Sequence, residues 1–329
     1  MADAAEPGGG PLRHIAVLCD DPNAYLGALA RAVFDGLEAG EAVLVALPAL
    51  RAAALRGLLG AVPRSVEFAD LTALGQNPAR ILPAMQAFAR RRAGRPARIV
   101  SEPVWPGRGD AETREAIRHE ALVNLAFDRE RVTVLCGYDA SALPEDIRLA
   151  AASTHPLIGA ADQAVASTRY GGPGTLPGYC DEPLPPPPGD AAVLPYETDL
   201  RGVRLLVAEH AARAGLPPAR AADLVLAVSE VTANTLTHTA GGGLARAWVT
   251  PHELICEVSD SGRIRDPLAW HRLPDPDHRG GHGLWLINQL CDLAEVRTGR
   301  RGTTIRLHMG RTAPANGLDG HGGHNGHVP

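Results

Sequence analysis

Short apolar runs alternate with longer amphipathic segments over the first half of the chain. The runs predict strands and the segments between them predict helices. The predicted strands are Ile15–Leu18, Ala42–Ala46, Val66–Phe68, Ile99–Val100 and Val132–Cys136, and the predicted helices are Asn23–Glu38, Arg51–Leu59, Asn77–Arg92, Glu112–Phe127 and Glu145–Thr154. This order predicts an α/β domain with a largely parallel sheet, whose ligands would bind beyond the strand carboxyl ends. Four side chains would fall there: Asp20, Asp70, Glu102 and Tyr138.

The longest amphipathic segment, Pro218–Thr239, predicts a helix with a core-facing stripe. The stripe consists of Leu224, Val228, Val231 and Thr235. A different face carries Glu230 and Asn234, which are neighbours because they are four residues apart. An Asn carbonyl oxygen suits Mg²⁺, and the carboxylate could accept a proton from an attacking hydroxyl. The same pair also fits two solvated residues on a surface helix.

Two predicted strands, Leu244–Thr250 and Leu254–Ser259, follow this helix, and the second ends at Asp260-Ser-Gly262. A carboxylate at a strand end could accept a hydrogen bond from the exocyclic amine of adenine. The glycine would leave space for the base beside the backbone. The alternative is an ordinary Asp-x-Gly turn.

Three glycines, Gly280, Gly281 and Gly283, precede Leu284 and a further predicted helix. Glycines before a helix N-terminus expose amide donors to a phosphate. The preceding segment, Arg263–Arg279, has the charge and proline content of a long mobile loop that could cover a nucleotide. The alternative is a flexible hinge with no ligand.

The chain contains no lysine, so all 32 of its Lys and Arg residues are arginines. A P-loop requires a lysine on the nucleotide phosphates. The protein-kinase fold also requires a strand lysine. Both classes of nucleotide site are therefore excluded.

Taken in this order and followed by Gly302-Thr-Thr304, the signatures resemble the Bergerat-fold (GHKL) ATPases. The variant is similar to the anti-sigma-factor serine kinases, and the resemblance covers Pro195–Met309. It implies an α+β sandwich that binds ATP and Mg²⁺. The chain departs from many relatives at position 282. It has His282 between Gly281 and Gly283, where many relatives carry Arg or Lys.

The resemblance also assigns roles to single residues. It makes Glu230 the catalytic base and Asn234 the Mg²⁺ ligand. The residues that it implies for nucleotide binding are Asn234, Asp260, Gly262, Gly281, Gly283, Leu284 and Thr303. Asp260 would read adenine with the help of Gly262, and Thr303 would close the adenine pocket, while the two glycines of Gly281-His-Gly283 would serve the phosphates.

The N-terminal half resembles the MEDS sensory domain, named for regulators of methanogens and methylotrophs. The resemblance, from His14 to Leu157, rests on His14-Ile15, Gly36–Glu41, Asn77–Arg80, Glu102–Trp105, Arg118–Leu125, Cys136–Asp139 and Thr154–Pro156. It implies a sensory function with an unknown small-molecule signal. A protein-interaction scaffold without a ligand is the alternative.

Arg118-His119-Glu120 looks superficially like the phosphoacceptor box of histidine kinases. Such a box normally lies on a two-helix hairpin directly before the ATPase domain, whereas His119 falls within the α/β pattern. A structural role for His119 is the better interpretation.

Length and composition favour two domains. We expect a disordered N-terminus (1–12), a sensory domain (13–160), a Pro/Gly-rich linker (161–195), an ATPase domain (196–310) and a disordered His/Gly tail (311–329). A net charge of −5 without a basic block argues against direct nucleic-acid binding. Five cysteines with no C-x-x-C pair, no signal peptide and no apolar run of membrane length predict a cytoplasmic protein.

The sequence thus predicts a signalling regulator that phosphorylates Ser or Thr on a partner. The partner would resemble an anti-anti-sigma factor, a sigma factor could bind as well, and the protein could form a homodimer. Two alternatives stay open: a sensor histidine kinase, and a non-catalytic switch in which ATP only sets the conformation that a partner recognises.

Overall fold

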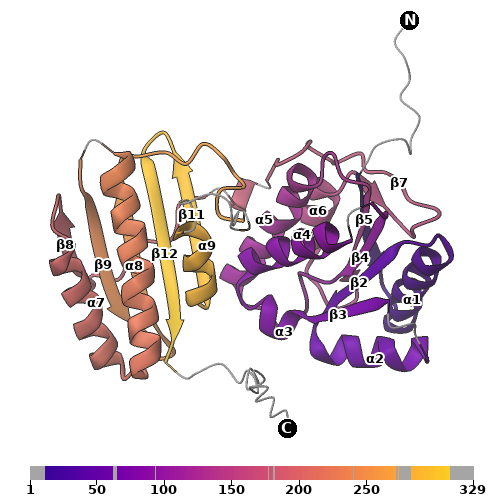
Figure 1. The fold of residues 1–329 in the computed structure, drawn as a ribbon, viewed down its shortest axis with the longest axis horizontal. Helices are drawn as coiled ribbons and strands as arrows, with labels where there is room; N and C mark the ends of the chain where they lie inside the picture. Colours follow the sequence, from indigo (N-terminus) through magenta and orange to yellow (C-terminus); the bar gives the residue numbers. More distant parts are fainter. Residues whose placement is uncertain are drawn as a thin grey trace, which may run out of the picture.

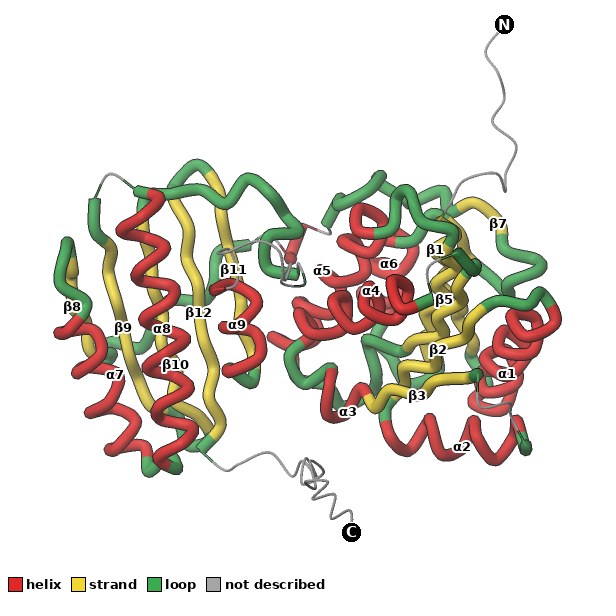
Figure 2. The backbone as a smooth tube through the Cα atoms, viewed as in Figure 1, coloured by secondary structure: helices red, strands yellow, loops and turns green. Residues whose placement is uncertain are grey.

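The computed structural model describes residues 12–61, 65–92, 94–176, 178–180, 182–239, 241–271, 273 and 283–311. These residues form two sheets with separate cores that lie side by side (Figures 1 and 2). The N-terminal sheet is mostly parallel with helices on both faces, and the C-terminal sheet is antiparallel with helices on one face. The predicted fold class is therefore confirmed for both halves.

The N-terminal sheet has the strand order β3-β2-β4-β5-β1-β6-β7. Its strands are β1 (Leu12–Cys19), β2 (Ala42–Leu47), β3 (Val66–Asp70), β4 (Ala97–Ser101), β5 (Val132–Asp139), β6 (Leu157–Ile158) and β7 (Val165–Ala166). Only β7 pairs with its neighbour in the antiparallel sense among the described strands of this sheet. Every residue of β2 is buried, as expected for a strand covered on both faces.

Helices α1 (Pro22–Glu38) and α2 (Ala49–Leu59) cover one face of this sheet, where Tyr25 and Leu55 join a core with Ile15 and Val45. The other face packs against α4 (Ile81–Arg91), α5 (Asp110–Ala126) and α6 (Glu145–Thr154). Short α3 (Leu71–Leu74) and the 3₁₀ helices η1 (Pro78–Arg80) and η2 (Gly178–Cys180) complete the half. The segment Asn77–Arg92, predicted as one helix, is thus η1 followed by α4.

The C-terminal sheet has the order β11-β12-β10-β9-β8. Its strands are β8 (Ala192–Tyr196), β9 (Gly243–Val249), β10 (Glu253–Asp260), β11 (Leu293–Gly299) and β12 (Gly302–Gly310). Its helices are α7 (Arg201–Ala214), α8 (Pro218–His238) and α9 (Gly283–Leu290). The residues of the stripe predicted on α8 are buried: Leu224, Val228, Val231 and Thr235. On another face of the helix, Leu226 is 42% exposed. Its hydrophobic pattern therefore correctly identified the packed face.

Strand β8 lies at the edge of the sheet and begins within the segment predicted as linker. Its residues alternate between partial burial and exposure, and it contains Pro195, a residue that sheets accept at their edges. The preceding Pro-rich segment is also packed on the protein. The carbonyl of Glu182 accepts from Arg297, and that of Pro185 accepts from Arg306. The segment therefore lies against the sheet and is not a free spacer.

The two halves meet through charged and polar contacts. Arg297 on β11 bonds Glu115 on α5 at 2.8 Å, and both side chains are about nine-tenths buried. Arg118, also on α5, donates to the carbonyl of Val296. Among the described helices, none is long and apolar enough to cross a membrane.

Candidate functional site

A cavity of about 400 Å³ lies between α8, the start of α9 and the ends of β10 and β12. Seven of the eight site residues proposed from sequence line it: Glu230, Asn234, Asp260, Gly262, Gly283, Leu284 and Thr303. The eighth, Gly281, lies outside the described residues. Residues from four separate elements thus form one pocket.

The strand end of the pocket holds Asp260 in a fixed orientation. One carboxylate oxygen accepts from the hydroxyl of Thr235 on α8 at 2.7 Å, and the other accepts from the backbone N–H of Gly262 at 2.7 Å. Antiparallel pairing places Thr303 directly beside Asp260, and its hydroxyl donates to the carbonyl of Gly262 at 2.9 Å. The carboxylate is therefore preorganised to accept a further hydrogen bond.

Thr235 is the residue of this site that sequence reasoning missed. Its spacing placed it in the apolar stripe of α8, and it is indeed buried. Its hydroxyl nevertheless donates a hydrogen bond to Asp260, which lies 25 residues further along the chain. A threonine within an otherwise aliphatic stripe was the available signal, because a buried hydroxyl requires a partner.

The helix end of the pocket brings Glu230 and Asn234 against the first residue of α9. A Cβ built on Gly283 would lie 2.6 Å from a carboxylate oxygen of Glu230 and 3.8 Å from the amide nitrogen of Asn234. Glycine allows this close approach of backbone to side chain. The start of α9 therefore lies directly over the Glu–Asn pair, where phosphates at a helix N-terminus would meet both side chains.

The loop predicted as a lid is only partly described. Its described part is packed: Trp270 is 5% exposed, and its carbonyl accepts from the amide of Asn288 on α9 at 2.7 Å. His271 faces the carbonyl of Ala79 in the other half of the molecule. This part of the loop therefore contacts both α9 and the other half of the molecule. Gly280 and His282 lie outside the described residues.

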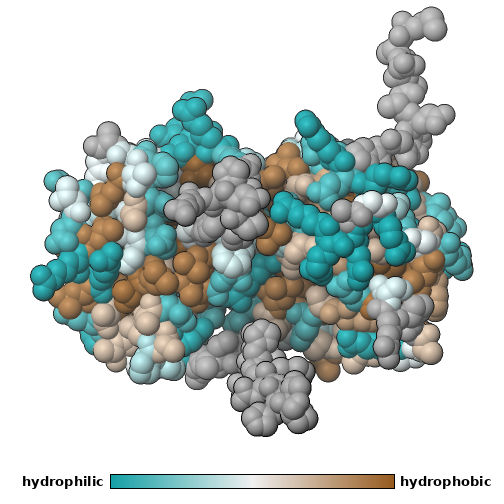
Figure 3. Space-filling view, in the orientation of Figure 1, coloured by the Kyte–Doolittle hydropathy of each residue, from teal (hydrophilic) through white to brown (hydrophobic). Residues whose placement is uncertain are grey.

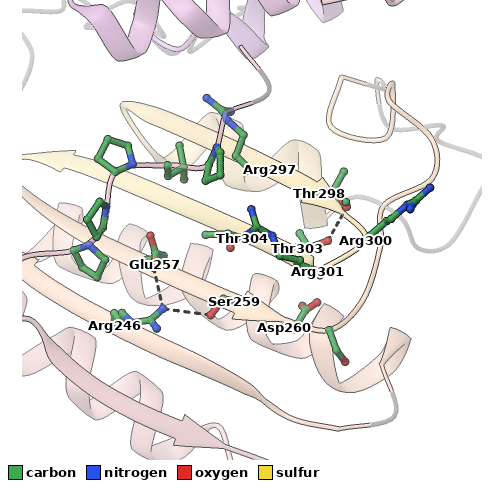
Figure 4. A pocket seen from close by; sticks show the side chains of 18 residues that line it. Arg246, Glu257, Ser259, Asp260, Arg297, Thr298, Arg300, Arg301, Thr303 and Thr304 are labelled. Atoms are coloured by element: carbon green, nitrogen blue, oxygen red, sulfur yellow. Dashed lines mark hydrogen bonds and ion pairs between the residues drawn. The ribbon is translucent and has the colours of Figure 1, made fainter. Parts of the chain in front are cut away.

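A larger cavity, of about 730 Å³, opens on the other side of the sheet (Figure 4). The Pro-rich segment 183–187 forms one wall, and Arg246, Arg300 and Arg301 contribute basic groups. The guanidinium of Arg246 already donates hydrogen bonds to Glu257 at 2.9 Å and to Ser259 at 3.3 Å. This cavity contains neither the Glu–Asn pair nor the start of α9. It shares Asp260 and Thr303 with the smaller cavity, but only the smaller cavity brings them together with the Glu–Asn pair.

The four side chains predicted at the strand ends of the N-terminal sheet do not converge. Asp20 and Asp70 are exposed, and Asp70 caps α3. Tyr138 and Glu102 are buried, but Tyr138 donates to Glu120 on α5 whereas Glu102 lies 3.8 Å from Arg51 on α2. Burial raises the pKa of Glu102 to about 7.

His119 lies on α5, fully buried, and neither ring nitrogen has a hydrogen-bond partner within the described part of the chain. Burial lowers its pKa to about 3. It is not among the residues that line the cavity between α8, α9 and β10. Its position therefore fits the structural interpretation of this histidine.

Comparison with known proteins identifies both halves. Residues 13–156 match the model of the MEDS family, described as "MEthanogen/methylotroph, DcmR Sensory domain", and residues 195–309 match that of the histidine kinase-like ATPase domain. No curated protein matches the chain at a significant level.

One solved structure that matches contains the RsbU and RsbW domains of Rv1364c from Mycobacterium tuberculosis. It is 23% identical with a TM-score of 0.29, and the match covers 38% of this chain and 34% of that one, so this chain spans about a third of that protein. On the family matches, the chain joins a MEDS domain at residues 13–156 to a histidine kinase-like ATPase domain at residues 195–309.

Proposed function

We propose that the C-terminal domain binds Mg-ATP in the cavity between α8, α9 and β10 and transfers the γ-phosphoryl group to a Ser or Thr hydroxyl of a partner protein. The partner would resemble an anti-anti-sigma factor. The observation that carries the proposal is the convergence of Glu230, Asn234 and Asp260 on one pocket in a domain of the histidine kinase-like ATPase family.

Asp260 would accept a hydrogen bond from the adenine amine, since Thr235 and Gly262 already fix its carboxylate. The side-chain oxygen of Asn234 is the neutral, hard ligand that suits Mg²⁺ together with phosphate oxygens and water. A Cβ at Gly283 would overlap the carboxylate of Glu230, so glycine lets the backbone amides at the start of α9 lie beside the Glu–Asn pair, where they would suit a bound polyphosphate. When bound, Mg²⁺ would neutralise charge on the phosphates.

Glu230 would act as the general base. The partner's hydroxyl oxygen forms a bond to the γ-phosphorus as the bond between that phosphorus and the oxygen of ADP breaks. The hydroxyl proton passes to Glu230, and ADP leaves with the electron pair of the broken bond. Since the chain has no lysine, backbone amides, the metal and arginines would carry the rest of the phosphate recognition.

The MEDS domain would control this site through α9. The helix begins at the pocket. Near its far end, the backbone carbonyl of Asn288 accepts hydrogen bonds from Arg80 and Asn77 of the MEDS domain. A signal that displaces η1 would therefore shift the helix over the Glu–Asn pair. The same linkage would serve a switch that binds ATP without transferring phosphate.

The proposal is tested with γ-labelled ATP, Mg²⁺, the full chain and purified anti-anti-sigma-type proteins as acceptors. We expect acid-stable label on an acceptor, at least a hundredfold slower labelling by Glu230→Gln, and unchanged ATP binding by that variant. Glu209→Gln, an exposed residue on α7, is the matched control. Acid-labile label would instead establish a histidine kinase. ATP binding without transfer by the unmodified chain would establish the non-catalytic switch.

A further inference from the structure

Four potential metal ligands meet in the interior of the MEDS domain. They are His14 on β1, Glu120 on α5, Cys136 on β5 and His155 just after α6, and each is 0% exposed. Their donor atoms all lie within 4.8 Å of one another. One oxygen of Glu120 is 3.2 Å from Nε2 of His14, 3.1 Å from Sγ of Cys136 and 3.6 Å from Nε2 of His155.

The outer nitrogen of each imidazole faces a hydrogen-bond acceptor. Nδ1 of His155 lies 2.8 Å from the carbonyl of Ala151, which can only accept, so Nδ1 carries the proton. Nδ1 of His14 lies 3.1 Å from the amide oxygen of Asn124. The amide nitrogen of Asn124 donates to the carbonyl of Thr154 at 2.8 Å, which keeps its oxygen toward His14. Nε2 of both rings is therefore left without a proton.

Two bare nitrogens and a carboxylate oxygen consequently face one point. In the neutral tautomers that these contacts favour, neither Nε2 carries a proton. Nε2 of His155 has no hydrogen-bond partner among the described residues. The S–H of Cys136 donates to the Glu120 oxygen at 3.1 Å, but acceptor nitrogens in a dry interior cost free energy unless a cation or proton lies beside them.

We propose that His14, Glu120, Cys136 and His155 bind a divalent metal ion of the zinc type. Zinc with nitrogen ligands at about 2.0–2.1 Å and sulfur at about 2.3 Å gives tetrahedral edges of about 3.3–3.6 Å. Four of the six separations between these donor atoms, including 3.5 Å from Sγ of Cys136 to Nε2 of His14, run from 3.1 to 3.6 Å, and all six are within 4.8 Å.

The charges balance as well. A thiolate and a carboxylate together cancel the two positive charges of the ion, so the loaded site is neutral in an interior that penalises net charge. A bond from sulfur to the metal replaces the S–H bond of Cys136, and the proton is released to solvent. Sulfur and imidazole ligands favour zinc over magnesium or calcium.

The surroundings resemble the outer ligand shell of known metal sites. The hydroxyl of Tyr138 donates to the second oxygen of Glu120 at 3.0 Å, which leaves the first oxygen for the metal. Each histidine donates its other N–H to a protein oxygen, as metal-bound histidines usually do. Four protein ligands and full burial are features of a structural site. The ion would tie β1 and β5 to α5, the helix that contacts the ATPase domain.

The first test is the metal content of the full chain purified from zinc-supplemented cells. Three tail residues that could bind metal incidentally, His321, His324 and His327, are replaced by Ala in every protein compared. We expect about one zinc per chain, retained after dialysis. Cys136→Ser should lose it, whereas Cys19→Ser, a thiol on the same strand as His14 but outside the cluster, should keep it.

Cobalt provides a second test that does not depend on the folding of a variant. Chelator-treated protein reloaded with Co²⁺ should show the sulfur-to-cobalt charge-transfer band and the intense visible bands of a tetrahedral site. Tyr138→Phe should lower the metal affinity about 10–100-fold. The proposal is overturned if the folded chain contains no stoichiometric metal and its titration with Co²⁺ produces neither band.

Discussion

Arg80 of the MEDS domain donates a hydrogen bond from Nε to the backbone carbonyl of Asn288 in α9, 2.6 Å away. Its Nη2 donates to the carbonyls of both Gln289 and Cys291, at 3.2 and 2.7 Å. These carbonyls lie at the carboxyl end of the helix that begins at Gly283, in the proposed nucleotide pocket. A cation at a helix carboxyl end also interacts favourably with the helix dipole. One arginine thus connects the MEDS domain to the helix over the Glu–Asn pair.

Replacement of Arg80 by Ala should loosen α9. Loss of charged hydrogen bonds worth about 1.5–3 kcal/mol should speed amide exchange in 283–290 about 10–100-fold. Hydrogen–deuterium exchange with mass spectrometry measures this directly. Arg90→Ala, an exposed arginine on α4, is the control. Unchanged protection in Arg80→Ala would refute a connection between the domains through this residue.

Asp260→Asn should weaken ATP binding about 10–150-fold, since a hydrogen bond to a charged group contributes about 1.5–3 kcal/mol. The amide has nearly the shape of the carboxylate, but its NH₂ group cannot accept from either Thr235 or the adenine amine. Calorimetric titration of the full chain with Mg-ATP measures the loss. Asp223→Asn on α8, outside the pocket, should bind as the unmodified chain does. Equal affinities would exclude Asp260 as the adenine acceptor.

Gly302→Ala should destabilise the C-terminal domain by about 2–4 kcal/mol. Gly302 has φ of 119°, and a Cβ there would overlap the backbone carbonyl of Asp260. The substitution would therefore also move Asp260 and weaken ATP binding. Gly299→Ala in the same hairpin meets no atom within 4 Å and is the matched control. Urea denaturation compares the two variants, and similar free energies of unfolding would contradict the expected strain.

His308 should make the stability of the C-terminal domain fall in mild alkali. Burial opposes its charge, but hydrogen bonds to Glu253 and Glu295 raise its pKa from 6.5 to about 9. Three arginines also act on Glu295: Arg114 and Arg297 lie 3.7 Å from its carboxylate, and Arg306 lowers its pKa by its charge. Because the pKa is raised in the folded state, the stabilisation is complete below pH 6.5 and is lost as the pH rises through 9.

Thermal denaturation across this interval should therefore show a steeper loss for the unmodified chain than for His308→Gln, which cannot take up the proton. The exposed His252→Gln at the β9–β10 turn should leave the slope unchanged. Equal slopes for His308→Gln and the unmodified chain would mean that the histidine is not charged in the folded protein.

Local pattern was sufficient for most elements. The stripe on α8 is a property of residues three and four apart, and the apolar runs of the N-terminal half extend into strands within a few residues of the predicted bounds. The edge strand β8 and helix α7 were not predicted. In β8, Pro195 and the half-exposed positions weaken the strand pattern. An edge strand can tolerate such residues because it forms by pairing with a neighbouring strand.

Motif order also identified which residues gather around the pocket, since each signature is short and continuous. The sequence could not show that Thr235 holds Asp260 or that Gly283 lies against Glu230. Those contacts join positions 25 or more residues apart, and their distances depend on how α8, α9 and the sheet pack.

The sequence by itself determined the two domain types, most of their elements and most of the residues that line the cavity between α8, α9 and β10, because periodicity and contiguous motifs are local properties. Only the tertiary structure decided that Glu120, and not His119, joins the buried cluster in Arg118-His119-Glu120. The sequence drew attention to His119, but about 100° of helix rotation places Glu120 among His14, Cys136 and His155. Strand register and helix packing bring these side chains together, and neither can be deduced from the spacing of residues along the chain.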